Sequence, residues 1–156
     1  MKLQFICGPF LQHLTQNDTL AQRCWENAFD TGLYYFEQMM WEDALPYLGQ
    51  AYETSIVIYS KPENGTSKGG ELLTATALAY LSTLANLGMS EFIAPIYRDT
   101  RQRLQELLQR NPDNGFWLTK FDEQIHEHKL HPELLSDFTG MLIVDRTIYP
   151  QSCALH

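Results

Sequence analysis

Three of the five histidines in this 156-residue chain lie close together, and their spacing comes nearer to a metal-binding pattern than any other in the sequence. Glu123 with His126, and Glu127 with His131, are spaced so that each pair shares one face of a helix. His126 and His128 point in different directions on an unbroken helix and cannot hold the same ion. Di-metal carboxylate bundles also need a second Glu-x-x-His motif, which the chain lacks. We therefore expect an exposed polar face without metal or cofactor, and a metal-binding helical enzyme using His126–His131 stays an alternative.

Nucleophilic catalysis and phosphate binding have less support in the sequence. Gly65–Gly69 has the Gly-x-Ser-x-Gly spacing, but a predicted helix rather than a strand precedes it, so it does not fit a nucleophile elbow. The cysteines, Cys7, Cys24 and Cys153, have no histidine beside them. Three cysteines cannot all pair within one chain, and their spacing fits neither a zinc site nor a redox motif, so we expect reduced thiols. Gly65–Gly70 is rich in glycine, but its spacing differs from that of a phosphate loop. We predict that the chain is not an enzyme.

Any site must be positioned by helices, because apolar residues recur at intervals of three and four along most of the chain. Thr19–Gln22 matches a capping box and predicts a helix start at Thr19. The apolar stripe that follows consists of Trp25, Ala28, Phe29, Gly32, Leu33, Phe36, Met39 and Met40. A second stripe runs from Trp41 to Ile56, with Glu42 and Asp43 where a helix N-terminus favours negative charge. These two segments predict a helical hairpin.

The remaining sequence predicts two further helix pairs. Residues 60–70 are dense in turn-forming types and predict a flexible loop. Beyond this loop we expect helices that begin near Glu71, Ile93, Trp117 and Pro132. Residues 1–17 form an N-terminal extension, with a candidate short helix at Pro9–Thr15 and a candidate extended segment at Leu3–Cys7. The predicted fold is one all-α domain over residues 1–156, with six helices in three antiparallel hairpins.

The charge balance argues against several classes of partner. Lys and Arg total 11 against 19 Asp and Glu, and the formal net charge of −8 repels nucleic-acid phosphates and anionic lipid headgroups. No apolar run approaches the roughly 20 residues that span a bilayer. Gln4 and Gly8–Pro9 interrupt the short apolar N-terminus before a signal-peptide core can form. We expect a cytoplasmic protein that binds neither nucleic acid nor membrane.

The first predicted hairpin, residues 25–56, resembles a tetratricopeptide repeat. This 34-residue helix-turn-helix unit carries a Gly and then a Tyr on its first helix, and an Ala, a large apolar residue and a second Ala on its second helix. Gly32, Tyr35, Ala44, Leu48 and Ala51 occupy these positions here. The resemblance implies a short right-handed solenoid in which the first helix of each hairpin lines a concave groove. In that family the groove receives an extended peptide or a helix of another protein.

Carried over residue by residue, the resemblance places seven side chains in this partner-binding groove. They are Glu26, Phe29, Leu33, Phe36 and Glu37 on the first helix, with Leu78 and Ser82 at the corresponding positions on the third. Phe29, Leu33 and Phe36 are equally compatible with an ordinary helical core. The acidic Glu26 and Glu37 favour a basic or amphipathic ligand segment.

The sequence therefore predicts a protein–protein interaction module, either an adaptor or a chaperone-like escort. In size and architecture it is similar to the tetratricopeptide chaperones of bacterial secretion systems. A homodimeric structural or scaffold protein is the alternative, because the Met39–Trp41 corner and the apolar run Met141–Val144 exceed what one core needs.

Overall fold

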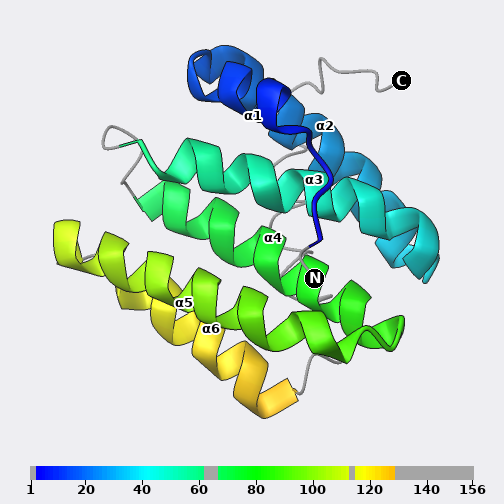
Figure 1. Ribbon diagram of the computed structural model, residues 1–156. Coiled ribbons are helices and arrows are strands. Elements are labelled where there is room, and N and C mark those ends of the chain that lie inside the picture. The colour runs from blue at the N-terminus through cyan, green and yellow to red at the C-terminus, as the bar shows by residue number, and fades with distance from the viewer. Residues whose placement is uncertain (1–2, 62–66, 113–114, 129–156) are drawn as a thin grey trace.

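Six α-helices and one short 3-10 helix make up the described part of the chain, residues 3–61, 67–112 and 115–128 of a computed structural model (Figure 1). In chain order they are α1 (Gly8–Thr15), α2 (Asp18–Glu37), α3 (Trp41–Tyr59), α4 (Ser67–Asn86), η2 (Ser90–Phe92), α5 (Ile93–Arg110) and α6 (Gly115–His128). No strand occurs among these residues, and the all-α prediction is confirmed for them. Within the same residues, no helix combines the length and apolar character that a bilayer crossing requires.

The N-cap of α2 lies two residues before the Thr19 cap that the capping box predicted. Its N-cap is Asn17, whose side-chain Oδ1 accepts a hydrogen bond from the backbone N–H of Leu20 at 3.0 Å. Thr19 lies inside the first turn, so the prediction of a Thr19 cap is wrong. Asn in an extended conformation satisfies an N-terminal N–H as well as Thr does, and Asp18 in the first turn adds a favourable charge.

Helices α2 and α3 run antiparallel and are held close by Gly32. Next to the turn, the rings of Phe36 and Trp41 meet edge to face, with 5.2 Å between their centroids. One helical turn farther from the turn, toward the start of α2, Gly32 packs against Leu48. The contact is so close that a β-carbon on Gly32 would lie 2.6 Å from Leu48 Cδ2. At the opposite end, Lys61 after α3 forms an ion pair with Asp18 at the start of α2. Contact thus continues from the turn to the far ends of both helices.

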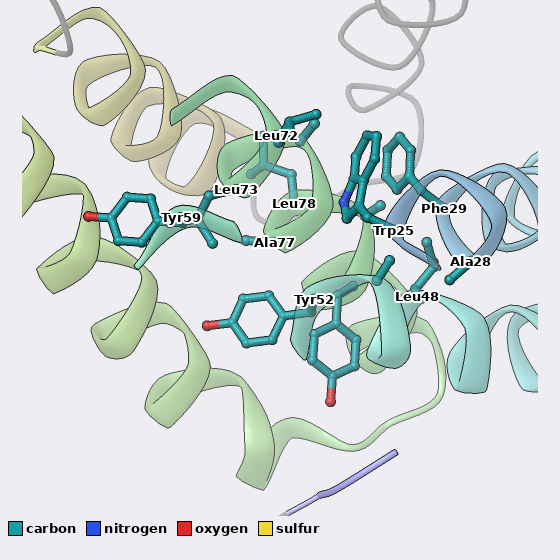
Figure 2. Packing of buried hydrophobic residues seen from close by; sticks show 14 of the residues in the cluster. Trp25, Ala28, Phe29, Leu48, Tyr52, Tyr59, Leu72, Leu73, Ala77 and Leu78 are labelled. Atoms are coloured by element: carbon teal, nitrogen blue, oxygen red, sulfur yellow. The ribbon is translucent and has the colours of Figure 1, made fainter. Parts of the chain in front are cut away.

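Helix α4 occupies the middle of the molecule (Figure 1). Every residue from Leu72 to Leu84 is buried, so this helix has no solvent-facing side over more than three turns. Its neighbours are α2 and α3 on one side and α5 and α6 on the other. Figure 2 shows the α2 rings of Trp25 and Phe29 lying near Leu72 and Leu78 of α4. A helix that is buried all round forms the centre of the core.

Two buried threonines of α4 bond to the helix itself, whereas the buried hydroxyl of Thr74 has no hydrogen-bond partner within the described chain. The hydroxyls of Thr76 and Thr83 donate to the carbonyls of Leu72 and Ala79, at 2.6 and 2.9 Å. Thr76 also accepts a hydrogen bond from Trp25 Nε1, at 3.0 Å, which joins α4 to α2. Hydroxyls bonded to the preceding helical turn can be buried at little cost.

Helices α5 and α6 close the other side of the core. The rings of Tyr97 and Phe121 stack with a centroid separation of 5.6 Å, and Arg101 pairs with Asp122, with 3.2 Å between Nε and Oδ1. Helix α5 reaches α3 as well, since the Tyr52 hydroxyl lies 2.8 Å from the Thr100 hydroxyl oxygen. These contacts link the C-terminal helices of the described chain to the central ones.

The structure corrects the predicted loop and extends the predicted N-terminal helix. Helix α4 begins at Ser67, so residues 67–70 of the predicted 60–70 loop are helical. Gly70 is small for a packing reason, because Trp117 of α6 lies against it, 2.9 Å from where a β-carbon would be. The candidate short helix is present as α1, with Pro9 in its first turn. The predicted helix from Pro132 and the apolar run Met141–Val144 lie outside the described residues.

The close approach at Gly32 makes a stability prediction. Gly32→Ala places a methyl group within 2.6 to 3.2 Å of the Leu48 side chain and backbone nitrogen, and the backbone cannot move aside as a side chain can. We expect a loss of about 1–3 kcal/mol in the free energy of unfolding despite the better helix propensity of alanine, measured by urea denaturation.

Gly8→Ala is the matched control, because nothing lies within 4 Å of a β-carbon at that position. It should change the free energy of unfolding by no more than about 0.5 kcal/mol. Equal effects of the two substitutions would contradict close packing of α2 on α3.

Candidate functional site

Most of the predicted groove residues are buried in the core. Phe29, Leu78 and Ser82 are fully buried, and Leu33 and Phe36 are nearly so. Of the seven predicted residues, the two acidic ones keep more surface: Glu26 is half-buried and Glu37 is exposed.

The burial follows from how α2 packs. Its apolar stripe is used to hold α3 and α4, as the contacts of Gly32 with Leu48 and of Trp25 with Thr76 show. The five buried residues therefore do not line an accessible groove in this structure. The expectation that they contact a partner directly is corrected to a core role.

The histidine cluster is only partly within the described chain. His126 and His128 belong to the last turn of α6, and His131 lies outside the described residues. Among the residues that the structure describes, no three His, Cys, Asp or Glu side chains come together in a way that could hold a metal ion.

Burial disfavours ionisation of two core tyrosines and of the Cys24 thiol. Burial raises the pKa of Tyr59 to about 12, and burial likewise raises the pKa of Tyr52. Both hydroxyls therefore stay neutral at physiological pH. Burial also raises the pKa of the Cys24 thiol, against the opposing charge of Arg23, which lowers its reactivity as a nucleophile.

Exposed large apolar side chains concentrate where α2 turns into α3. Tyr34, Met39, Met40 and Tyr47 are exposed there, with 60% and 67% of the Tyr34 and Met39 surfaces accessible. Phe10 and Phe116 are the other large apolar residues with comparable exposure in the described chain, and they lie on α1 and α6. We call Tyr34, Tyr35, Met39, Met40 and Tyr47 the corner surface.

The tyrosines of the corner surface form a continuous row across both helices. The Tyr34 and Tyr35 rings meet edge to face at a centroid distance of 5.3 Å. Tyr35 then stacks on Tyr47 of α3, with 5.8 Å between centroids and 22° between the ring planes. Because each ring restrains the next, the row offers a firm apolar face rather than separate mobile side chains.

Met39 holds an unfavourable backbone conformation at the centre of this surface. Its φ of 58° is the one positive value on a non-glycine residue within the described chain. The N–H groups of Met40 and Met39 donate to the carbonyls of Tyr35 and Phe36, at 2.9 and 3.0 Å, which is the Schellman pattern that ends many helices.

The end of α4 repeats this pattern with the residue that normally occupies it. There the N–H groups of Met89 and Gly88 donate to the carbonyls of Leu84 and Ala85, and the residue with positive φ is Gly88. A side chain in the left-handed region costs roughly 1–2 kcal/mol. At Met39 this conformational cost accompanies a large apolar side chain that is exposed to solvent. The stability of the turn therefore does not explain why methionine occupies this position.

The corner surface lies in a strongly acidic part of the chain. From Cys24 to Ser60 the sequence has six acidic residues and no Lys, Arg or His; the acidic residues are Glu26, Asp30, Glu37, Glu42, Asp43 and Glu53. Glu37 lies one helical turn from Tyr34, Asp43 one turn from Tyr47, and both carboxylate residues are exposed. The apolar face therefore has a negative rim.

Sequence reasoning found part of this surface. Met39 and Met40 were assigned to the apolar stripe of the first helix and, with Trp41, to a self-association corner, whereas Tyr34 and Tyr47 were missed. Both tyrosines lie off the stripe that packs in the core, and that position in the sequence was the signal available. Their meeting through Tyr35 depends on the α2–α3 packing.

The positive φ of Met39 predicts that the turn can be stabilised. Met39→Gly should raise the free energy of unfolding by about 0.5–1 kcal/mol in thermal or urea denaturation, because relief of the left-handed strain exceeds the entropy that glycine adds to the unfolded chain. Gly88→Ala introduces the same left-handed strain and should lower the free energy of unfolding by about 1 kcal/mol. Destabilisation by Met39→Gly would show that the methionine side chain contributes to the fold.

No protein-family model, no curated protein and no solved structure matches this chain. The function proposed below therefore rests on its own residues and their arrangement.

Proposed function

We propose that this chain is a protein–protein interaction module, an adaptor or chaperone-like protein, that binds a helical segment of a partner at the corner surface. The observation that carries the proposal is the strained, exposed Met39 in the turn that follows the tyrosine row of α2. Methionine and tyrosine are enriched at interfaces, since methionine adapts its shape to a partner and tyrosine offers area at low entropic cost.

The acidic rim supports a partner with positive charge. Glu37, Glu42 and Asp43 are exposed around the corner surface, and no basic residue between Cys24 and Ser60 offsets them. An amphipathic helix with large apolar residues on one face and Lys or Arg beside them complements both features. The negative net charge of the whole chain adds long-range attraction for such a segment.

The tetratricopeptide resemblance also belongs to this proposal. The close contact of Gly32 with Leu48 is what the small signature residues are expected to permit, and it supports a solenoid-like stack of hairpins. The burial of the predicted groove residues shifts the proposed docking site outward to the corner surface. Cytoplasmic location remains part of the same proposal, based on charge and on the expected reduced thiols.

A second copy of the chain fits the corner surface less well. In a symmetric dimer formed by this face, Glu37, Glu42 and Asp43 would meet their own equivalents. Like charges facing each other disfavour association. The homodimeric scaffold is therefore the weaker proposal.

Partner capture with matched variants tests the proposal. Affinity capture from native lysate should recover a partner with the unmodified chain and lose it with the triple substitution Tyr34→Ser, Met40→Ser, Tyr47→Ser, because the apolar contact area is removed. Phe116→Ser is the control, since Phe116 is equally exposed but lies on α6. Phe36→Ala is unsuitable, because Phe36 is buried and its loss would destabilise the fold.

Equal recovery of the same partner by the triple variant would contradict docking at the corner surface. A variant that is monomeric when the unmodified chain is dimeric in light scattering would instead support the scaffold alternative.

The acidic rim makes a separate prediction. Glu37→Lys should weaken the complex by a factor of about two or more, since an exposed charge pair contributes about 0.2–1 kcal/mol and reversal adds repulsion. The difference from the unmodified chain should shrink as salt is raised, which titration calorimetry at two ionic strengths would measure. An unchanged affinity at low salt would exclude Glu37 from the interface.

A further inference from the structure

The segment Leu3–Cys7, at the N-terminal end of the described chain, packs against helices α3 and α4. It has no helical or strand structure of its own and runs from α1 across α3 toward α4 (Figure 1). Its contacts are with Gly49 and Glu53 of α3 and with Tyr80 of α4. We call these three residues the seat.

The seat recognises the backbone of this segment through one carboxylate. The backbone N–H of Phe5 donates to Oε2 of Glu53 at 2.8 Å, and that of Ile6 donates to Oε1 at 3.4 Å. Backbone N–H groups are present in every peptide, so this contact does not select a sequence except against proline. It does select a bent, non-helical conformation. Two successive N–H groups point at one carboxylate here, whereas they alternate in direction along an extended strand and are used within the helix in a helix interior.

The seat recognises one side chain through a notch at Gly49. A β-carbon on Gly49 would lie 2.2 Å from Phe5 Cδ2, so the aromatic ring occupies space that any other residue would fill. The same ring meets Tyr80 edge to face, with a centroid distance of 6.1 Å and an interplanar angle of 82°. Ile6, the next residue, is buried. The notch therefore fits an aromatic residue followed by an aliphatic one.

The link between this segment and α1 is open. Cys7 and Gly8 are exposed, and nothing lies within 4 Å of the β-carbon position of Gly8, so the chain has room to pivot before α1. Leu3 and Phe5 are only half-buried, and Gln4 is exposed. Ile6 belongs to the core cluster, and Leu3 and Phe5 pack against it, so a segment that leaves the seat uncovers this edge of the core.

We propose that the seat is a second binding site, for a short non-helical segment of another polypeptide that carries an aromatic–aliphatic pair, and that Leu3–Ile6 is its internal competitor. The chemistry of the occupant is visible in the contacts that the chain makes with itself. A tethered segment competes at an effective concentration of about millimolar, so a foreign segment binds well only when it outcompetes Phe5 and Ile6. This site is separate from the corner surface and does not depend on the function proposed for it.

Weakening the internal competitor tests this proposal on the full chain. The probe is a fluorescent peptide with the sequence of residues 2–8, in which Cys7→Ser prevents oxidation. Phe5→Ala in the protein should lower the dissociation constant of this peptide by about tenfold or more in fluorescence anisotropy, since the internal segment loses its ring. Phe10→Ala is the matched control, because Phe10 is exposed on α1 and its ring lies tilted against that of His13 instead. It should leave the dissociation constant at the value of the unmodified chain.

Two further substitutions connect the binding to the seat. Gly49→Ala in the Phe5→Ala protein fills the notch and should abolish peptide binding, and a peptide with Phe5→Ala should not bind either protein. If Phe5→Ala fails to fold by circular dichroism, Phe5→Leu keeps the apolar volume and removes the ring, and the same comparison is made with it.

The proposal is overturned if the folded Phe5 variant binds no peptide up to about millimolar concentration, or if Gly49→Ala leaves the binding intact. A dimer of the unmodified chain that excess peptide dissociates, measured by light scattering, would assign the seat to the N-terminal segment of a second copy and overturn the assignment to a foreign partner. Failure of the corner-surface variants to lose their partner would leave these peptide results unaffected, so the two proposals are tested separately.

Discussion

The burial of α4 is the constraint on which the rest of the structure depends. From Leu72 to Leu84 this helix presents no residue to solvent, so every direction around it must be covered by another part of the chain. Helices α2 and α3 cover one side, and α5 and α6 cover the other. Close approach is possible because bulky side chains meet small residues: Leu48 lies on Gly32, and Trp117 lies on Gly70. The buried hydroxyls of Thr76 and Thr83 bond to helical carbonyls, so the core tolerates these two polar groups.

This constraint also decides which residues are left for binding. A side chain that is buried in the core cannot also line an accessible groove. The structure buries Phe29, Leu33 and Phe36 in the core. The large apolar side chains that α2 and α3 leave exposed lie around the turn between them, where Tyr35 connects Tyr34 to Tyr47. The methionine in a left-handed conformation at this turn contrasts with Gly88 at the equivalent position after α4. One chain thus contains the strained and the relaxed form of the same helix ending, and the strained form coincides with the exposed apolar surface.

Much of the fold could be predicted from local pattern. The stripes of α2, α3 and α5 follow from spacings of three and four, and the closeness of Gly32 to Leu48 agrees with the packing expected of small residues. The start of α2 could not be placed, because Asn17 and Thr19 are both good N-caps and the choice depends on which one the preceding chain holds in an extended conformation. The start of α4 was misplaced for a different reason. Residues 67–70 carry turn-forming types, yet Gly70 serves to admit Trp117, a partner 47 positions away in the sequence.

The sequence by itself determined the helical class, the acidic charge and the positions of the apolar stripes, because these depend on residue type and on neighbours within one or two turns. Only the tertiary structure decided which stripe residues are buried and which remain exposed. Burial depends on how many helices surround a given face, and no local spacing records that number. The same reason explains why the sequence did not reveal the seat, which consists of Gly49, Glu53 and Tyr80. These residues belong to two helices, and they form a group only because the N-terminal segment Leu3–Cys7 packs against both.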